Sequence, residues 1–163
     1  MLAFEETYFK KRQYTHKEQL VKRHVLQVLR WASKASNFDL LKGQGKRALD
    51  VGCATGYTSS VLAELGYQTC GIDISSWGTK QAKGIAKCQY VVCDTQHYLP
   101  FLPEAFDLVT CFDVLEHLLC PEKALLNMFA ASKGSLVCTT PNKKIEKAIR
   151  KFTGDYDETH VSV

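Results

Sequence analysis

A run of small residues follows a short apolar segment in the first third of the chain. Ala48 to Val51 has the composition of a buried strand, and Gly52 and Gly56 bracket the turn that follows it. Glycine has no side chain, so a ligand can lie against the main-chain N–H groups of such a turn, at the start of the next helix. Residues 47–57 therefore predict a site at which a small molecule approaches the backbone.

Three aspartates, Asp50, Asp73 and Asp94, each come at the end of a strand-like run. The carboxyl ends of parallel strands meet at one edge of a sheet, so these carboxylates should converge beside the small-residue turn. The three acids and the turn together therefore predict one ligand site at this edge of the sheet.

The same turn disfavours one familiar class of ligand. A G-x-G-x-x-G dinucleotide site that starts at Gly52 would need glycine at positions 54 and 57, where the chain has Ala54 and Tyr57. Tyr57 is the worse fit, because the third glycine of that motif lets the helix pack closely on the strand. A nicotinamide-dependent dehydrogenase is therefore disfavoured.

Strands and helices alternate along most of the chain and must position these residues. Strand-like segments near 46–51, 67–72, 89–93, 106–112 and 135–139 are separated by helix-like segments near 57–65, 75–86, 121–132 and 142–152. An amphipathic helix is expected at about 16–36, and the proline-punctuated segment 99–103 is expected to be irregular. Such alternation predicts parallel strands with right-handed crossovers, in an α/β doubly wound sheet of about five strands with helices on both faces.

The order of these motifs resembles the class I S-adenosylmethionine-dependent methyltransferases. The sequence D-V-G-C-A-T-G at 50–56 is similar to the family's cofactor loop, residues 106–118 to its fourth strand with the following loop and helix, and residues 135–142 to its fifth strand. The resemblance implies a Rossmann-like fold, S-adenosyl-L-methionine as cofactor, and methyl transfer to a small-molecule acceptor.

The resemblance also implies which residues hold the cofactor. They are Asp50, Gly52, Cys53, Ala54, Gly56, Asp73, Ile74, Asp94, Thr95, Phe112 and Asp113. The loop would take the methionine end, and Asp50 would orient that loop or meet the amino group. Asp73 would accept hydrogen bonds from both ribose hydroxyls, or act only as the cap of the next helix.

The remaining residues of the resemblance have the following implied roles. Ile74 would press on the adenine, Asp94 with Thr95 would contact its amino group, and Phe112 with Asp113 would flank the sulfonium. His117 matches a family motif and would act as a general base near the acceptor, or else pin its helix. Tyr8 and Tyr14 would close over the cofactor or pack against the exterior, and His160 lies in a segment similar to the family's substrate side.

The cysteines and the charge point to a compartment and a partner class. The seven cysteines include no C-x-x-C pair, so no zinc site is expected, and Cys70, Cys93, Cys111 and Cys138 fall in predicted buried strands.

No signal peptide or membrane span is apparent, so we expect a soluble cytoplasmic protein. The net charge of +4 comes partly from clusters near 10–23 and 143–151, which are typical of solvated helix faces, so nucleic acid is not favoured as a partner.

By length the chain is a single domain, 1–163, with an N-terminal helical segment at 1–45, a cofactor-binding core at 46–142 and a substrate-side segment at 143–163. The family's sheet normally has seven strands, and residues 157–163 look like the start of the sixth. We therefore expect a fragment that lacks the C-terminal strands and self-associates through an exposed sheet edge.

Two alternative functions remain open at this stage. One is a cofactor-binding module without activity, and the other is an RNA or protein methyltransferase that uses the basic helices. The proline-rich and Pro-Cys motifs of DNA methyltransferases are missing from the sequence.

Overall fold

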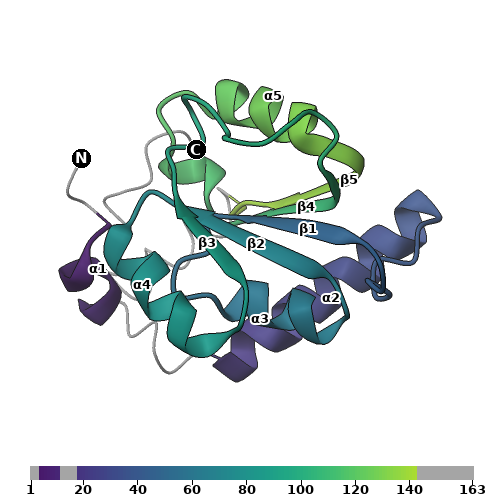
Figure 1. Ribbon diagram of the computed structural model, residues 1–163, viewed down its shortest axis with the longest axis horizontal. Coiled ribbons are helices and arrows are strands. Elements are labelled where there is room, and N and C mark those ends of the chain that lie inside the picture. Colours follow the sequence, from purple (N-terminus) through teal and green to yellow (C-terminus); the bar gives the residue numbers. More distant parts are fainter. Residues whose placement is uncertain (1–3, 12–17, 143–163) are drawn as a thin grey trace.

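The computed structural model describes residues 4–11 and 18–142 (Figure 1). The strands are β1 (Arg47–Val51), β2 (Gln68–Asp73), β3 (Gln89–Val92), β4 (Phe106–Phe112) and β5 (Ser132–Thr139). They form one five-stranded sheet in the order β3-β2-β1-β4-β5, and every pairing is parallel. Strands β2 and β3 are added on one side of β1, and β4 and β5 on its other side. The switch point lies between β1 and β4, so ligands are expected at the carboxyl ends of these two strands. The predicted doubly wound fold is confirmed.

The helices cover both faces of the sheet. They are α1 (Glu6–Lys11), α2 (Glu18–Ser36), α3 (Tyr57–Glu64), α4 (Ser76–Ile85) and α5 (Pro121–Ala131), with a 3₁₀ turn, η2, at Leu115–His117. Helices α2, α3 and α4 lie on one face and α5 on the other, whereas α1 lies beside α4 (Figure 1). Helix α4 begins where the hydroxyl of Ser75 accepts a hydrogen bond from the Gly78 N–H at 2.9 Å.

Two buried layers hold the helices to the sheet. On the α5 face, Ile72, Val109 and Met128 are fully buried, because alternate residues of each strand point to the same side. On the opposite face, Leu29 and Leu62 pack against inward-facing strand residues. The central strands are therefore buried on both faces, and their carboxyl ends position the loops.

Some local predictions need correction. Cys93 was expected inside a buried strand, but it follows the end of β3 and is only half-buried, because β3 lies at the edge of the sheet. Strand β5 starts at Ser132 rather than near residue 135, because Ser132 still pairs with Phe106. The connection 93–105 has turns and no helix, as its prolines predict.

Some expectations fall on residues that the structure does not describe. The expected helix near 142–152, apart from Asn142, lies outside the described residues, as do the segment 157–163, His160 and Tyr14. Within residues 4–11 and 18–142, none of the helices has the length and apolar character needed to cross a bilayer. The same residues contain no cluster of histidine, cysteine and acidic side chains that could hold a metal ion.

Candidate functional site

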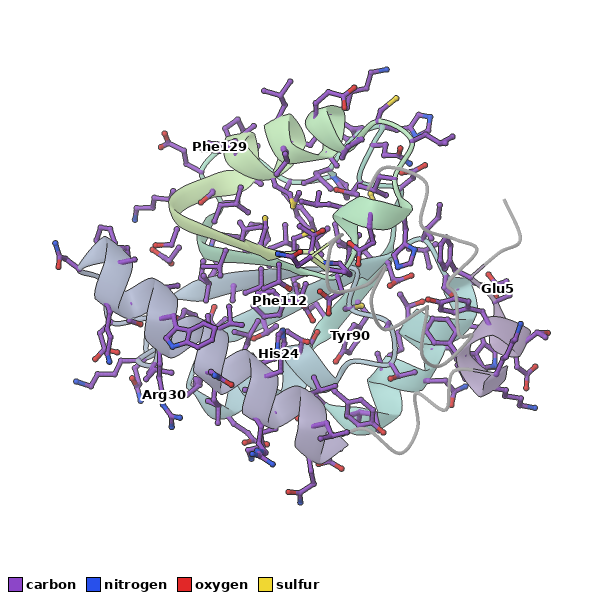
Figure 2. All side chains as sticks on the ribbon, turned by 180° about the vertical axis from the view of Figure 1, so that it is seen from behind. Glu5, His24, Arg30, Tyr90, Phe112 and Phe129 are labelled. Carbon is purple, nitrogen blue, oxygen red and sulfur yellow. The ribbon has the colours of Figure 1, made fainter. Side chains whose placement is uncertain are left out.

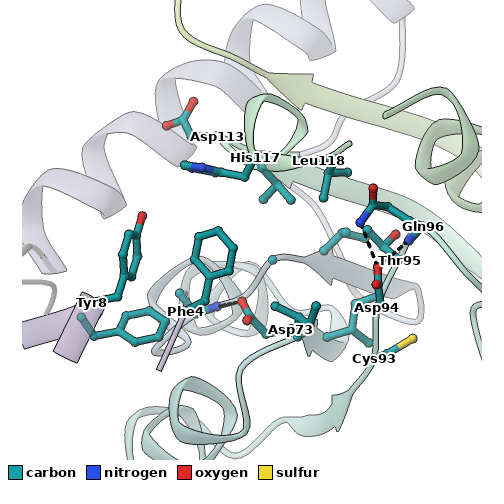
Figure 3. Close-up of a pocket in the computed structure, with 17 residues that line it drawn as sticks. Phe4, Tyr8, Asp73, Cys93, Asp94, Thr95, Gln96, Asp113, His117 and Leu118 are labelled. Atoms are coloured by element: carbon teal, nitrogen blue, oxygen red, sulfur yellow. Dashed lines mark hydrogen bonds between the residues drawn. The ribbon is translucent and has the colours of Figure 1, made fainter. Parts of the chain in front are cut away.

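A cavity, called here the first cavity, lies at the carboxyl ends of β1, β2 and β4. Its wall includes Gly52, Ala54, Asp73, Asp94, Asp113 and His117. Figure 3 shows Asp113 and His117 on one side of this cavity, Asp73 and Asp94 on the other, and Phe4 between them. The sheet therefore brings together residues from four separate loops, at the edge that the strand order predicts.

Asp73, the last residue of β2, fastens the two loops that meet at the first cavity. Its Oδ2 accepts a hydrogen bond from the Ala54 N–H at 2.8 Å, and its Oδ1 accepts one from the Ser75 N–H at 2.8 Å. Burial raises the pKa of Asp73, and the two N–H donors oppose that rise. The helix cap itself is Ser75, so Asp73 is not the cap of α4. Each carboxylate oxygen keeps a lone pair, which leaves acceptor capacity for a ligand in the cavity.

The loop between β1 and α3 has an unusual backbone. Gly52, Ala54 and Gly56 adopt φ values of 74°, 47° and 88°, in the left-handed region that favours glycine. Ala54 occupies this region without being glycine, and its N–H is held by Asp73. The conformation turns the loop back beneath the first cavity and exposes main chain to it.

Asp94 and Thr95 follow β3 and line the first cavity on the same side as Asp73. Asp94 Oδ1 accepts from the Gln96 N–H at 2.9 Å, and its Oδ2 lies 2.9 Å from His97 Nδ1. The Thr95 carbonyl accepts from the Asn127 amide at 2.8 Å, which ties this loop to α5. The Thr95 hydroxyl is buried and makes no hydrogen bond within the described part of the chain. A buried hydroxyl of this kind needs a partner, and the first cavity is where a ligand would supply one.

A second cavity adjoins the first, and the two share Gly52, Ala54 and Asp113. It lies between the first half of α2 and the end of β4, where His24 meets the ring of Phe112 edge-on with centroids 6.0 Å apart (Figure 2). Cys53 lines the second cavity and not the first. Phe112 is likewise in the second cavity only. The two cavities therefore meet at the β1–α3 loop and at Asp113.

Two of the residues expected to bind cofactor do not line either cavity. Asp50 is 2% exposed, and its carboxyl lies beneath the loop, where it accepts from the Ser59 hydroxyl at 2.6 Å and the Thr110 hydroxyl at 3.2 Å. A Cβ at Gly56 would lie 2.8 Å from the Cβ of Ala82. Gly56 therefore permits close packing of the loop on α4, and Asp50 supports the loop from below.

Asp113 and Thr139 join the ends of β4 and β5 at the first cavity. The Asp113 N–H donates to the Thr139 carbonyl at 3.0 Å, and the Thr139 hydroxyl donates to Asp113 Oδ1 at 3.1 Å. Asp113 has φ 55°, so this reciprocal pair holds a strained residue in place. His117 follows one turn later in η2 and faces the same cavity.

Sequence reasoning missed part of the wall. Phe4 and Phe9 line the first cavity, as do Gln96, Val114 and Leu118. Tyr8, which was expected either over the cofactor or on the exterior, also lines the first cavity. The ring of Phe4 meets the rings of Tyr8 and His117 edge-on, with centroid separations of 5.1 and 5.5 Å. The spacing of Phe4 and Tyr8, one helical turn apart, was the available signal.

Gly52→Ala should lower the free energy of unfolding by more than about 1–2 kcal/mol, the cost of placing an alanine in the left-handed region of backbone conformation. The added Cβ would collide with Cγ2 of Val114, in addition to the strain of φ 74°. Chemical denaturation measures the effect. Gly45→Ala is the matched control, because Gly45 has φ 75° and nothing within 4 Å of an added Cβ. Equal losses of stability in the two variants would show that the contact with Val114 is unimportant.

The chain is similar to known proteins in both sequence and fold. The family profile described as "Methyltransferase domain" matches residues 16–163. The ubiquinone biosynthesis O-methyltransferase of Coxiella burnetii (strain Dugway 5J108-111) is 32% identical over 117 residues, which cover 68% of this chain and 50% of that protein. The mitochondrial ubiquinone biosynthesis O-methyltransferase of Schizosaccharomyces pombe is 33% identical over 109 residues, with 62% and 40% coverage. The chain thus spans half or less of the length of these curated relatives.

Solved structures share the fold. A SAM-dependent methyltransferase from Archaeoglobus fulgidus matches with a TM-score of 0.73 and 24% identity, over 97% of this chain and 67% of that one. A magnesium protoporphyrin IX methyltransferase from Synechocystis PCC 6803, solved with bound SAH, matches with a TM-score of 0.69 and 22% identity, over 93% and 75%.

Proposed function

Because this chain belongs to the S-adenosylmethionine-dependent methyltransferases of class I, we propose that its two-part cavity carries methyl transfer from that cofactor to a hydroxyl group of a small-molecule acceptor. The single observation that carries the proposal is the convergence of Asp73, Asp94 and the Gly52 loop around one cavity at the carboxyl ends of the strands. The two curated relatives named above are O-methyltransferases, which supports oxygen as the accepting atom.

The described residues fit the cofactor. Asp73 would accept hydrogen bonds from the ribose hydroxyls, with Ile74 against the base. The buried hydroxyl of Thr95 and the carboxylate of Asp94 would meet the polar edge of the adenine. The methionyl end would lie toward the second cavity, where the N-terminus of α3 favours its carboxylate. The two cavities share Gly52, Ala54 and Asp113, which supports this division.

The protein contributes to methyl transfer mainly by aligning the acceptor with the methyl group. When bound, S-adenosylmethionine supplies a methyl group that a sulfonium already activates. Holding an acceptor in line with that methyl contributes up to about 7–11 kcal/mol in favourable cases. Asp113, which lines both cavities, would orient the groups there, and the imidazole of His117 would take the proton of the acceptor hydroxyl.

Asp73→Ala should weaken binding of S-adenosylhomocysteine by about 10- to 150-fold, equivalent to about 1.5–3 kcal/mol for the loss of a charged acceptor. Calorimetry on the full chain measures the affinity. With the parent protein, ligand at 100 times its dissociation constant should also raise the free energy of unfolding by about 2.7 kcal/mol.

Asp39→Ala is the matched control for this experiment. Asp39 also accepts a hydrogen bond from the backbone N–H two residues on, that of Leu41 at 3.1 Å, but it lines neither cavity. The control should bind as tightly as the parent. Equal affinity in Asp73→Ala would mean that Asp73 serves only to fasten the loops, and a parent that binds no ligand would overturn the proposed function.

A further inference from the structure

Two cysteines face each other across neighbouring strands close to the cavities. Cys111 in β4 and Cys138 in β5 are directly paired in the parallel register, and both point to the face that α5 covers. Neighbouring strands lie about 4.7–4.9 Å apart, within the Cα separation of roughly 4.4–6.8 Å that a disulfide accepts. The Cβ atoms of such a pair lie about as far apart as the strands, slightly more than the 3.5–4.5 Å or so that a disulfide requires. An S–S bond would therefore draw the ends of β4 and β5 together.

The two thiols differ in environment. Cys111 is fully buried, whereas Cys138 is half-buried and is the more exposed of the two. A hydrogen bond from the Cys111 thiol lowers the pKa of Cys138 and raises that of Cys111. Burial raises the pKa of four other cysteines, Cys53, Cys70, Cys88 and Cys93. Since the thiolate is the reactive form, Cys138 is the expected nucleophile of the pair.

The pair is linked to the site through its immediate neighbours. Thr139 follows Cys138 directly, and Asp113 lies two residues after Cys111. These two neighbours hold each other by the reciprocal hydrogen bonds of 3.0 and 3.1 Å, at a residue that lines both cavities. A change in the spacing between the ends of β4 and β5 would therefore displace Asp113.

We propose that Cys111 and Cys138 are a site of reversible oxidation by peroxide, which joins β4 to β5 and weakens cofactor binding at Asp113. The Cys138 thiolate attacks the O–O bond of hydrogen peroxide, takes one oxygen as a sulfenic acid and releases hydroxide. The Cys111 sulfur then displaces water from that sulfenic acid, and the S–S bond forms. The two electrons lost by the pair reduce the peroxide, and a dithiol such as dithiothreitol reverses the bond.

The oxidation is tested on the full chain with hydrogen peroxide, mass spectrometry of the intact protein and peptide mapping. The expected result is a loss of about 2 Da, carried by one cross-linked peptide pair that contains Cys111 and Cys138 and restored by dithiothreitol. Cys138→Ser and Cys111→Ser should each abolish the cross-link. Cys120→Ser, at the start of α5 and also half-buried, is the matched control and should retain it. A cross-link between other cysteines, or a gain of oxygen without a cross-link, would overturn the proposal.

The effect on binding rests on the proposed function and has its own measurement. Oxidised protein should bind S-adenosylhomocysteine about tenfold more weakly than reduced protein, and dithiothreitol should restore the affinity. Unchanged affinity in a fully cross-linked protein would overturn the link to Asp113. Reduced protein that binds no ligand would instead contradict the function, while the mapped cross-link would still report on the cysteines. The parent chain alone gives both results if a variant fails to fold.

Discussion

His117→Ala should lower the rate of methyl transfer to a phenolic acceptor by about 100- to 10,000-fold at neutral pH, the usual contribution of a positioned general base. A phenol has a pKa near 10 and is protonated at pH 7, so its oxygen needs a base before it attacks a methyl group. His117 lines the first cavity together with Asp113 and is well placed for that role. Turnover with S-adenosylmethionine and catechol as the probe acceptor measures the loss.

Two further measurements separate a base from a structural role. Affinity for S-adenosylhomocysteine should stay within about twofold of the parent, because the base acts on the acceptor and not on the cofactor. The loss in rate should shrink as the pH approaches 10 or so, where the acceptor ionises by itself. A loss that is equal at every pH, with weakened cofactor binding, would show that His117 only pins η2 and its contact with Phe4.

Asp50→Asn should raise the free energy of unfolding above pH 7 by up to about 4 kcal/mol. This figure corresponds to the difference of about three between the pKa of Asp50 in the folded protein and its pKa in the unfolded chain. Burial raises the pKa of Asp50 from 3.8 to about 7, against the hydrogen bonds from Ser59 and Thr110. Between about pH 4 and 7 the folded protein keeps a proton that the unfolded chain has released, so the parent loses stability as the pH rises. An asparagine stays neutral and can still accept from Ser59.

Urea denaturation across this pH range gives the comparison. When the free energy of unfolding is plotted against pH, the curves of parent and variant should meet near pH 4, diverge up to about pH 7 and run parallel above it. Asp39→Asn is a control in which the pKa shift has the opposite sign. The carboxyl of Asp39 is exposed, and the hydrogen bond that it accepts from Lys42 lowers its pKa. Curves of parent and Asp50→Asn that stay parallel from pH 4 to 8 would contradict the prediction.

The sheet was predictable because each strand has a local signal. Residues 48–51 and 106–112 are short apolar runs between helical patterns, and alternation of strand and helix permits few topologies. The ends of elements were less predictable. Ser132 to Gly134 carry no strand pattern of their own, and they continue β5 only because β4 offers a partner at Phe106.

The site was predictable in outline and not in the orientation of its side chains. Asp50 and Asp73 look alike in the sequence, since both are acids near the end of a strand. Asp50 points beneath the loop because Thr110, 60 residues later, and Ser59 supply its donors. Asp73 faces the first cavity because β2 ends there. Such distant partners leave no trace in the local sequence pattern.

The pairing of β1 with β4 has a consequence for how the molecule assembles. Asp50 and Thr110 meet at the centre of the sheet although 60 residues separate them, and the strand pairs that flank the cavities are all non-local. Non-local pairing is slow to nucleate, because a long loop must close before any contact is gained. The carboxyl edge that forms the cavities cannot exist until this closure has occurred. We therefore expect the ligand site to form only once β1 and β4 have paired.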